Sequence, residues 1–255
     1  PLRGDVAPRE RALLTAGVVV ASLAAWVWLV REAATMSGMA HMAMPDLRVW
    51  SLAELGALVV MWAVMMTAMM LPSATPTILL FASVQRARRA RRNVAVPAAI
   101  FVGGYLLVWT GYASLAALAQ WTLHAAAMLS PAMAATSPVL GGVILLAAGL
   151  YQWSPVKQVC LSRCHSPFGF VAREWREGAR GALVMGMRHG SFCVGCCALL
   201  MTLLFVAGVM NLLWVAALAV LVLAEKTLPG GRWIARGAGL LLTGAGIWLL
   251  AGAGP

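Results

Sequence analysis

The chain has 255 residues, of which 62% are hydrophobic and 11% are charged, and its formal net charge is +11. A soluble globular domain carries about a quarter of its residues as charges, so this composition excludes a soluble protein. The apolar residues gather in stretches close to the ~20 residues with which a helix crosses a bilayer. The sequence therefore predicts an all-α, polytopic bundle of transmembrane helices that forms one domain over residues 1–255.

We expect about seven spans, and the basic residues orient them. The predicted spans are 12–30, 51–72, 94–121, 137–153, 191–209, 211–225 and 233–253. Seventeen basic residues fall in the connections on one side of the membrane, and only Arg31 and Arg48 fall on the other. Because connections rich in Lys and Arg stay in the cytoplasm, we expect an integral protein of a bacterial inner membrane with a cytoplasmic N-terminus. The lipid bilayer, and not a nucleic acid, is then the partner of this charge.

The connection after the first span is rich in soft metal donors. Its segment MSGMAHMAMP (36–45) surrounds His41 with four methionines. Thioether sulfur suits Cu(I) better than hard cations, so this segment is similar to the Met- and His-rich segments that gather copper. The alternative is a methionine-rich loop that lies in the lipid interface.

The second span contains a row of five methionines in MWAVMMTAMMLPS (61–73). At 100° per residue, Met61, Met65 and Met69 fall on one stripe of the helix together with Glu54, with two further methionines on its flank. A carboxylate inside a span usually marks a site or a pathway, which favours a row of thioether ligands. The alternative is packing, because methionine fills irregular gaps between helices.

Residues 153–190 are expected to form a long cytoplasmic loop, in which FVAREWREGAR (170–180) has the spacing of a short interfacial helix. All the cysteines of the chain lie in this loop or at the start of the fifth span: Cys160, Cys164, Cys193, Cys196 and Cys197. On a helix, His189 would share one face with two of them. Because the cytoplasm keeps thiols reduced, two tight cysteine clusters favour metal ligation or redox chemistry over disulfides. Inert buried thiols are the alternative.

The sixth span follows a break at GVMN (208–211) and ends on Glu225 and Lys226. Asn211 is a suitable residue to cap the helix that begins there. We expect Glu225 and Lys226 to pair with each other at the inner face. Residues 191–225 could also form one broken helix, which would change the side on which the C-terminus lies.

Four stretches together resemble the domain-of-unknown-function 2182 family: MWAVMMTAMMLPS, YQWSPVKQVCLSRCHSP, GSFCVGCCALLM and GVMNLLWVAALAVLVLAEK. The resemblance covers about residues 50–230, and the family is described as predicted metal-binding integral membrane proteins. It implies a seven-helix-like membrane domain that binds a metal. The residues that match its motif positions are Met61, Met65, Met69, Cys160, Cys164, Cys193, Cys196, Cys197 and Glu225.

The function predicted from these residues is a soft-metal relay for transport, delivery or homeostasis. Cu(I) is gathered near His41, passes Glu54 and the methionine stripe, and reaches the thiolates. Zinc is the second candidate metal. A protein that donates or accepts the metal is the expected partner, since the chain contains no nucleotide-binding motif.

Two other classes of function stay open at this stage. A membrane thiol oxidoreductase would use Cys193 and Cys196 as a reversible dithiol and would not need the methionines. An assembly factor would hand the metal to a copper enzyme. We expect a protein that is not itself an enzyme, because copper oxidases need several histidine ligands and this chain has four scattered histidines.

Overall fold

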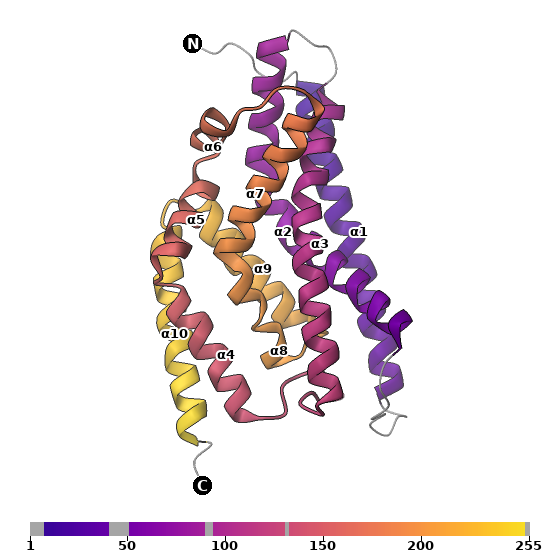
Figure 1. Cartoon of the computed structure of the whole chain (residues 1–255), viewed down its shortest axis with the longest axis vertical. Helices are drawn as coiled ribbons and strands as arrows, with labels where there is room; N and C mark the ends of the chain where they lie inside the picture. The colour runs from indigo at the N-terminus through magenta and orange to yellow at the C-terminus, as the bar shows by residue number, and fades with distance from the viewer. Residues whose placement is uncertain (1–7, 41–50, 90–93, 131–132, 253–255) are drawn as a thin grey trace.

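The computed structural model describes residues 8–40, 51–89, 94–130 and 133–252, and most of these residues are helical (Figure 1). The helices are α1 (Pro8–Ala40), α2 (Leu52–Arg89), α3 (Ala95–Ala125), α4 (Pro138–Tyr151), α5 (Pro155–His165), α6 (Pro167–Glu174), α7 (Gly178–Met201), α8 (Leu204–Ala207), α9 (Leu212–Thr227) and α10 (Gly231–Gly252).

The helices form two packed groups that α9 joins. In Figure 1, α2 begins at the lower end of the bundle and runs to the upper end, and α3 and α7 run back down. Helices α1, α2, α3 and α7 pack in series, while α4 packs along α10. Because α9 contacts both α2 and α10, the end of α9 meets residues from both groups. That meeting point is where the candidate site lies.

Five helical segments of the described chain are long and apolar enough to cross a membrane. They are Pro8–Thr35, Leu52–Arg88, Ala95–Ala125, Gly178–Ala207 and Gly231–Gly252. The pair formed by α4 and α5 is bent by 62° and counts as a sixth span if it crosses as one unit. The 16 residues of α9 fall short of the ~20 that a span needs. The all-α membrane class is thus confirmed, and the count of seven spans is not.

The expectation that about 153–190 form a long loop is wrong, while its cytoplasmic side stays a prediction. This stretch forms α5, α6 and the first half of α7. Ser154 and Ser166 each cap a helix, accepting hydrogen bonds from the backbone N–H groups of Lys157 and Gly169. A proline follows each serine at the first helical position, where its missing N–H costs nothing. The expected interfacial helix over 170–180 is split in the structure, because α6 ends at Glu174 and α7 begins at Gly178.

The break before the sixth predicted span is confirmed. Gly208 has a φ of +95°, in the region that favours glycine, and it separates α8 from α9. The Asn211 side chain accepts a hydrogen bond from the backbone N–H of Trp214 at 3.2 Å, so it caps α9 as expected. Two separate spans and one broken helix both contain such a break, so it leaves both arrangements of residues 191–225 open.

Two glycines let α3 and α7 approach closely. A Cβ atom at Gly186 of α7 would lie 2.0 Å from the Phe101 carbonyl oxygen, and one at Gly104 of α3 would lie 2.3 Å from the Leu183 carbonyl oxygen. In lipid no hydrophobic force drives helices together, so their association depends on close van der Waals packing. Small residues such as these glycines permit that packing. The close approach positions the lower half of α7, with its cysteines, against α3.

Candidate metal centre

Three buried thiols lie on α7. Cys193, Cys196 and Cys197 are each 1% exposed, and the Sγ atoms of Cys196 and Cys197 are 3.2 Å apart. Cys193 and Cys197 are four residues apart on a continuous helix, so they share a face, and their thiols interact. Cys196 donates to the backbone carbonyl of Cys193 at 3.2 Å.

Helix α5 brings the other two cysteines to the same place. A Cβ atom at Gly195 would lie 2.7 Å from the Cys160 sulfur, so the glycine leaves room for this thiol against the α7 backbone. Cys164 is buried and interacts with the Cys196 thiol. All five cysteines are free thiols. We call this group of five the thiol centre; its two sequence clusters meet because α5 packs on α7.

A buried lysine lies beside the thiol centre. Lys226, in the last turn of α9, is 5% exposed, and its Nζ lies 2.8 Å from the Cys193 sulfur and 3.4 Å from the Ser73 hydroxyl. Among the ion pairs of the described residues, none joins Lys226 to a carboxylate. A buried charge needs a partner. The thiolate form of Cys193 is therefore the counter-charge that the geometry offers to this ammonium.

The methionine row ends at this lysine. The sulfur of Met70 lies 4.0 Å from the Lys226 Nζ, and the Tyr105 hydroxyl donates to the Met70 carbonyl at 3.0 Å and lies 3.0 Å from the Cys193 sulfur. Met61, Met65 and Met69 are buried along the same helix. Met70, which the sequence placed only on the flank of the stripe, is thus the methionine that this geometry links to the thiol centre.

The other end of the row opens on a pocket. Met61, Glu54 and Glu32 line a hollow of about 410 Å³ at the lower end of α2. The Glu54 carboxylate also accepts hydrogen bonds from the backbone and hydroxyl groups of Ser51, at 2.6 and 2.8 Å, so it caps the helix. His41 lies outside the described residues.

His189 lies one turn before Cys193 in an aromatic setting. Its ring centroid is 5.1 Å from that of Phe170 and 5.7 Å from that of Tyr105. The side chain is 3% exposed, and its Nδ1 atom has no hydrogen-bond partner. A buried nitrogen without a hydrogen-bond partner is uncommon. The Nδ1 atom of His189 is therefore available as a metal ligand, one helical turn before Cys193.

The expected pair between Glu225 and Lys226 does not form. Lys157 instead donates to one Glu225 carboxylate oxygen at 2.7 Å, and the Gln152 amide donates to the other at 2.9 Å. All three side chains are buried, and His165 contacts the Glu225 backbone carbonyl. Lys157 and Lys226 were counted among the basic residues that predict the orientation in the membrane. Because both are buried, they are not exposed charges of that kind. Both carboxylate oxygens of Glu225 are engaged, and they tie α9 to α4 and α5.

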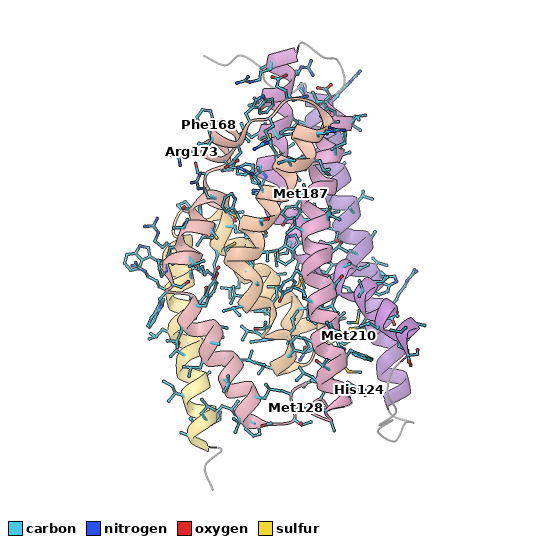
Figure 2. All side chains as sticks on the ribbon, in the orientation of Figure 1. His124, Met128, Phe168, Arg173, Met187 and Met210 are labelled. Atoms are coloured by element: carbon cyan, nitrogen blue, oxygen red, sulfur yellow. The ribbon has the colours of Figure 1, made fainter. Side chains whose placement is uncertain are left out.

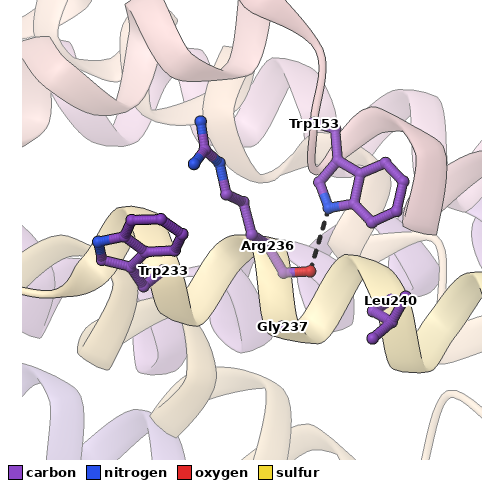
Figure 3. A pocket seen from close by; sticks show the side chains of 5 residues that line it. All are labelled: Trp153, Trp233, Arg236, Gly237 and Leu240. Carbon is purple, nitrogen blue, oxygen red and sulfur yellow. Dashed lines mark hydrogen bonds between the residues drawn. The ribbon is translucent and has the colours of Figure 1, made fainter.

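The donors gathered at this place are soft sulfurs. Among the described residues, no group of three or more His, Cys, Asp or Glu side chains is placed to hold a metal ion. Thiol and thioether sulfurs suit Cu(I), which accepts few and soft ligands. A second hollow, between Trp153 and α10, is lined by Trp233, Arg236, Gly237 and Leu240 and offers no sulfur (Figure 3).

Comparison with known proteins agrees with this donor set. A family model described as PpoB2, copper chaperone, matches residues 59–249, well over half of the chain. The chain belongs to the PpoB2 copper chaperone family. No curated protein and no solved structure matches it. Together with its long apolar helices, this family makes the chain a copper-related membrane protein.

The PpoB2 match contains the methionine row, all five cysteines and both buried lysines, and it leaves out His41 and Glu54. The predicted metal-binding character thus gains a named metal, copper, and zinc gains no support. Lys226 and Tyr105 were missed as parts of the site. A signal for Lys226 was present in the sequence, because only two of the 19 basic residues are lysines. Both are buried in the structure.

Proposed function

We propose that the protein is a membrane copper chaperone that receives Cu(I) through the methionines of α2 and holds it at the thiol centre for transfer to another protein. The observation that carries this proposal is the meeting of five free thiols with the end of a buried methionine row. Membership of the PpoB2 copper chaperone family supports copper as the cargo.

The methionine row offers a route between two ends. With 1.5 Å of rise per residue, Met61 and Met70 are separated by about 14 Å along α2. The pocket at Met61 lies at the lower end of the bundle, and the predicted orientation places that end outside the cytoplasm. Copper would therefore enter at this pocket, near Glu54 and the segment that contains His41, and move towards Met70.

Ligand chemistry gives the route a direction. Thioethers are neutral and bind Cu(I) weakly, whereas thiolates are charged and bind it tightly. Copper that enters among the methionines is thus held most firmly at the thiol centre. From there a partner protein with its own thiolates can take it by ligand exchange, either for delivery to a copper enzyme or for storage.

Changing Met61, Met65 and Met69 together to Leu is expected to slow Cu(I) loading of the thiol centre by about tenfold, equal to about 1.4 kcal/mol of barrier. Leucine keeps the apolar volume but has no sulfur, and the thiols still set the final occupancy. Loading is measured by rapid mixing of the detergent-solubilised protein with a Cu(I)–chelator complex.

The matched control changes Met187 and Met210 to Leu. Met187 lies on α7 above the thiol centre, and Met210 lies at the break before α9 (Figure 2). These changes should leave the loading rate as it is in the parent protein. Equal rates for the triple variant, the control and the parent protein would exclude the methionine route.

A further inference from the structure

Lys226 differs from every other basic residue of the described chain in its setting. Its ammonium is buried among two sulfurs, a serine hydroxyl and a tyrosine that shares the Cys193 thiol. The other buried lysine, Lys157, has the Glu225 carboxylate as its partner. Since moving an ammonium out of water is costly unless a charge compensates it, the positive charge at Lys226 has to be balanced by the site itself.

We infer that Lys226 is a specificity-determining residue of the copper site, whose ammonium supplies the counter-charge for one Cu(I) held by the two thiolates of Cys193 and Cys197. The inference rests on the proposed function, and it names the ligand pair and the reason for which a monovalent ion is preferred.

Charge balance gives the selectivity. Two thiolates and one Cu(I) carry a net charge of −1, which the Lys226 ammonium brings to zero. Two thiolates and one Zn²⁺ are already neutral, so the ammonium would leave a buried excess of +1. No electron is transferred on binding; two sulfur–copper bonds form, and any proton on a thiol leaves to water. Lys226 therefore favours the monovalent ion and opposes the divalent one.

Contact with the ammonium selects Cys193 among the five thiols, and the spacing of four residues on α7 adds Cys197. Cys193 is the thiol that the ammonium contacts, at 2.8 Å, and Cys197 lies one turn further on the same face of α7 and interacts with it. Cys196 donates to the Cys193 backbone carbonyl, interacts with Cys164 and has its Sγ 3.2 Å from that of Cys197, but the thiol that the ammonium contacts is Cys193. Met70 lies on the other side of the ammonium, where an ion arriving along α2 would first meet the site.

The presence of lysine and not arginine at position 226 supports a role as a compact positive charge. Arginine supplies 17 of the 19 basic residues of the chain. A guanidinium is broad and planar, whereas an ammonium is a point charge on a flexible stem. Only the smaller group suits a space between the Cys193 sulfur and the Ser73 hydroxyl, which lie 2.8 and 3.4 Å from Nζ.

The test compares Lys226→Gln with the parent protein, both as full chains in detergent. Cu(I) and Zn(II) affinities are measured by competition with chromophoric chelators under anaerobic conditions. Lys226→Gln should lower the Cu(I) affinity by about 10- to 100-fold, as changes next to metal ligands do, and it should leave the Zn(II) affinity equal or higher. The control Ser73→Ala removes a neutral neighbour of the ammonium and should leave the ratio of the two affinities unchanged.

An unchanged ratio in Lys226→Gln, with Cu(I) still bound by the parent protein, would overturn the inference and leave the proposed function standing. Absence of Cu(I) binding by the parent protein would instead overturn the proposed function and the inference with it. If Lys226→Gln does not fold, X-ray absorption at the copper edge of the copper-loaded parent protein tests the inference instead, because it counts the sulfur ligands of the bound Cu(I). A shell of two sulfurs is expected, and a shell of three or four sulfurs, or one dominated by nitrogen, would overturn the inference.

Discussion

Replacing Cys193 and Cys197 together by serine is expected to remove nearly all copper from the purified protein. A serine hydroxyl is a hard donor that does not hold Cu(I) at neutral pH, and both side chains lie on the face of α7 that meets Lys226 and Met70. Copper per chain, measured by elemental analysis after anaerobic purification, should fall by at least about tenfold, because no soft donor pair remains beside Lys226.

The control for this pair is Ser191→Ala, an exposed position on the same helix. It should keep the copper content and the helical circular dichroism of the parent protein. Full copper content in the double serine variant would contradict a thiol site on α7. A reversible disulfide between Cys193 and Cys196, with a loading rate independent of the methionines, would instead favour the thiol oxidoreductase.

Changing Glu225 to Gln is expected to destabilise the fold strongly, by about 3–5 kcal/mol of unfolding free energy. The change leaves the Lys157 ammonium buried without a charged partner, at the point where α4, α5 and α9 meet. The free energy of unfolding is measured by denaturant titration of the detergent-solubilised protein, followed by circular dichroism.

The matched control is Glu174→Gln, which breaks the ion pair with Arg188. The Arg188 side chain is 48% exposed, so water screens this pair and its loss should cost no more than about 1 kcal/mol. Equal effects of the two substitutions would mean that the buried pair does not hold the helices together. Lys226 would then lose part of the support that positions it, because it is the neighbour of Glu225 on α9.

The sequence alone was enough for the all-α membrane class and for the relation to copper. Composition excludes a soluble protein, and apolar stretches near the length of a span predict membrane helices, although their expected number, seven, is not confirmed. The sulfur donors could be found because they are concentrated: five methionines fall between Met61 and Met70, and the five cysteines form two short clusters. Soft donors in such density predicted copper, which agrees with the family that the chain belongs to.

The region 153–190 was misjudged because hydropathy compares a segment with lipid. Helix α5 mixes polar and apolar residues, and its buried face includes Lys157 and Cys164. A short helix that buries a lysine does not stand out as a helix on a hydropathy scale. Local signals for the correct answer were present in the serine–proline pairs at 154–155 and 166–167, which are typical of helix starts.

The partner of Lys226 could not be deduced from its position beside Glu225. Adjacent residues on a helix point about 100° apart, so Glu225 faces α4 and α5 while Lys226 faces α2 and α7. Which neighbours each residue meets depends on how α9 docks between the two helix groups. The sequence contains no direct signal for that docking.

A thiol-held copper site is tested most simply by an anaerobic titration of the wild-type protein with Cu(I), followed by the ultraviolet charge-transfer absorption of sulfur-bound copper. This absorption is expected to grow and then stop at about one Cu(I) per chain, because a single soft-donor site takes up the copper. No such absorption, or copper that binds without it, would contradict a thiol-held copper site in this protein.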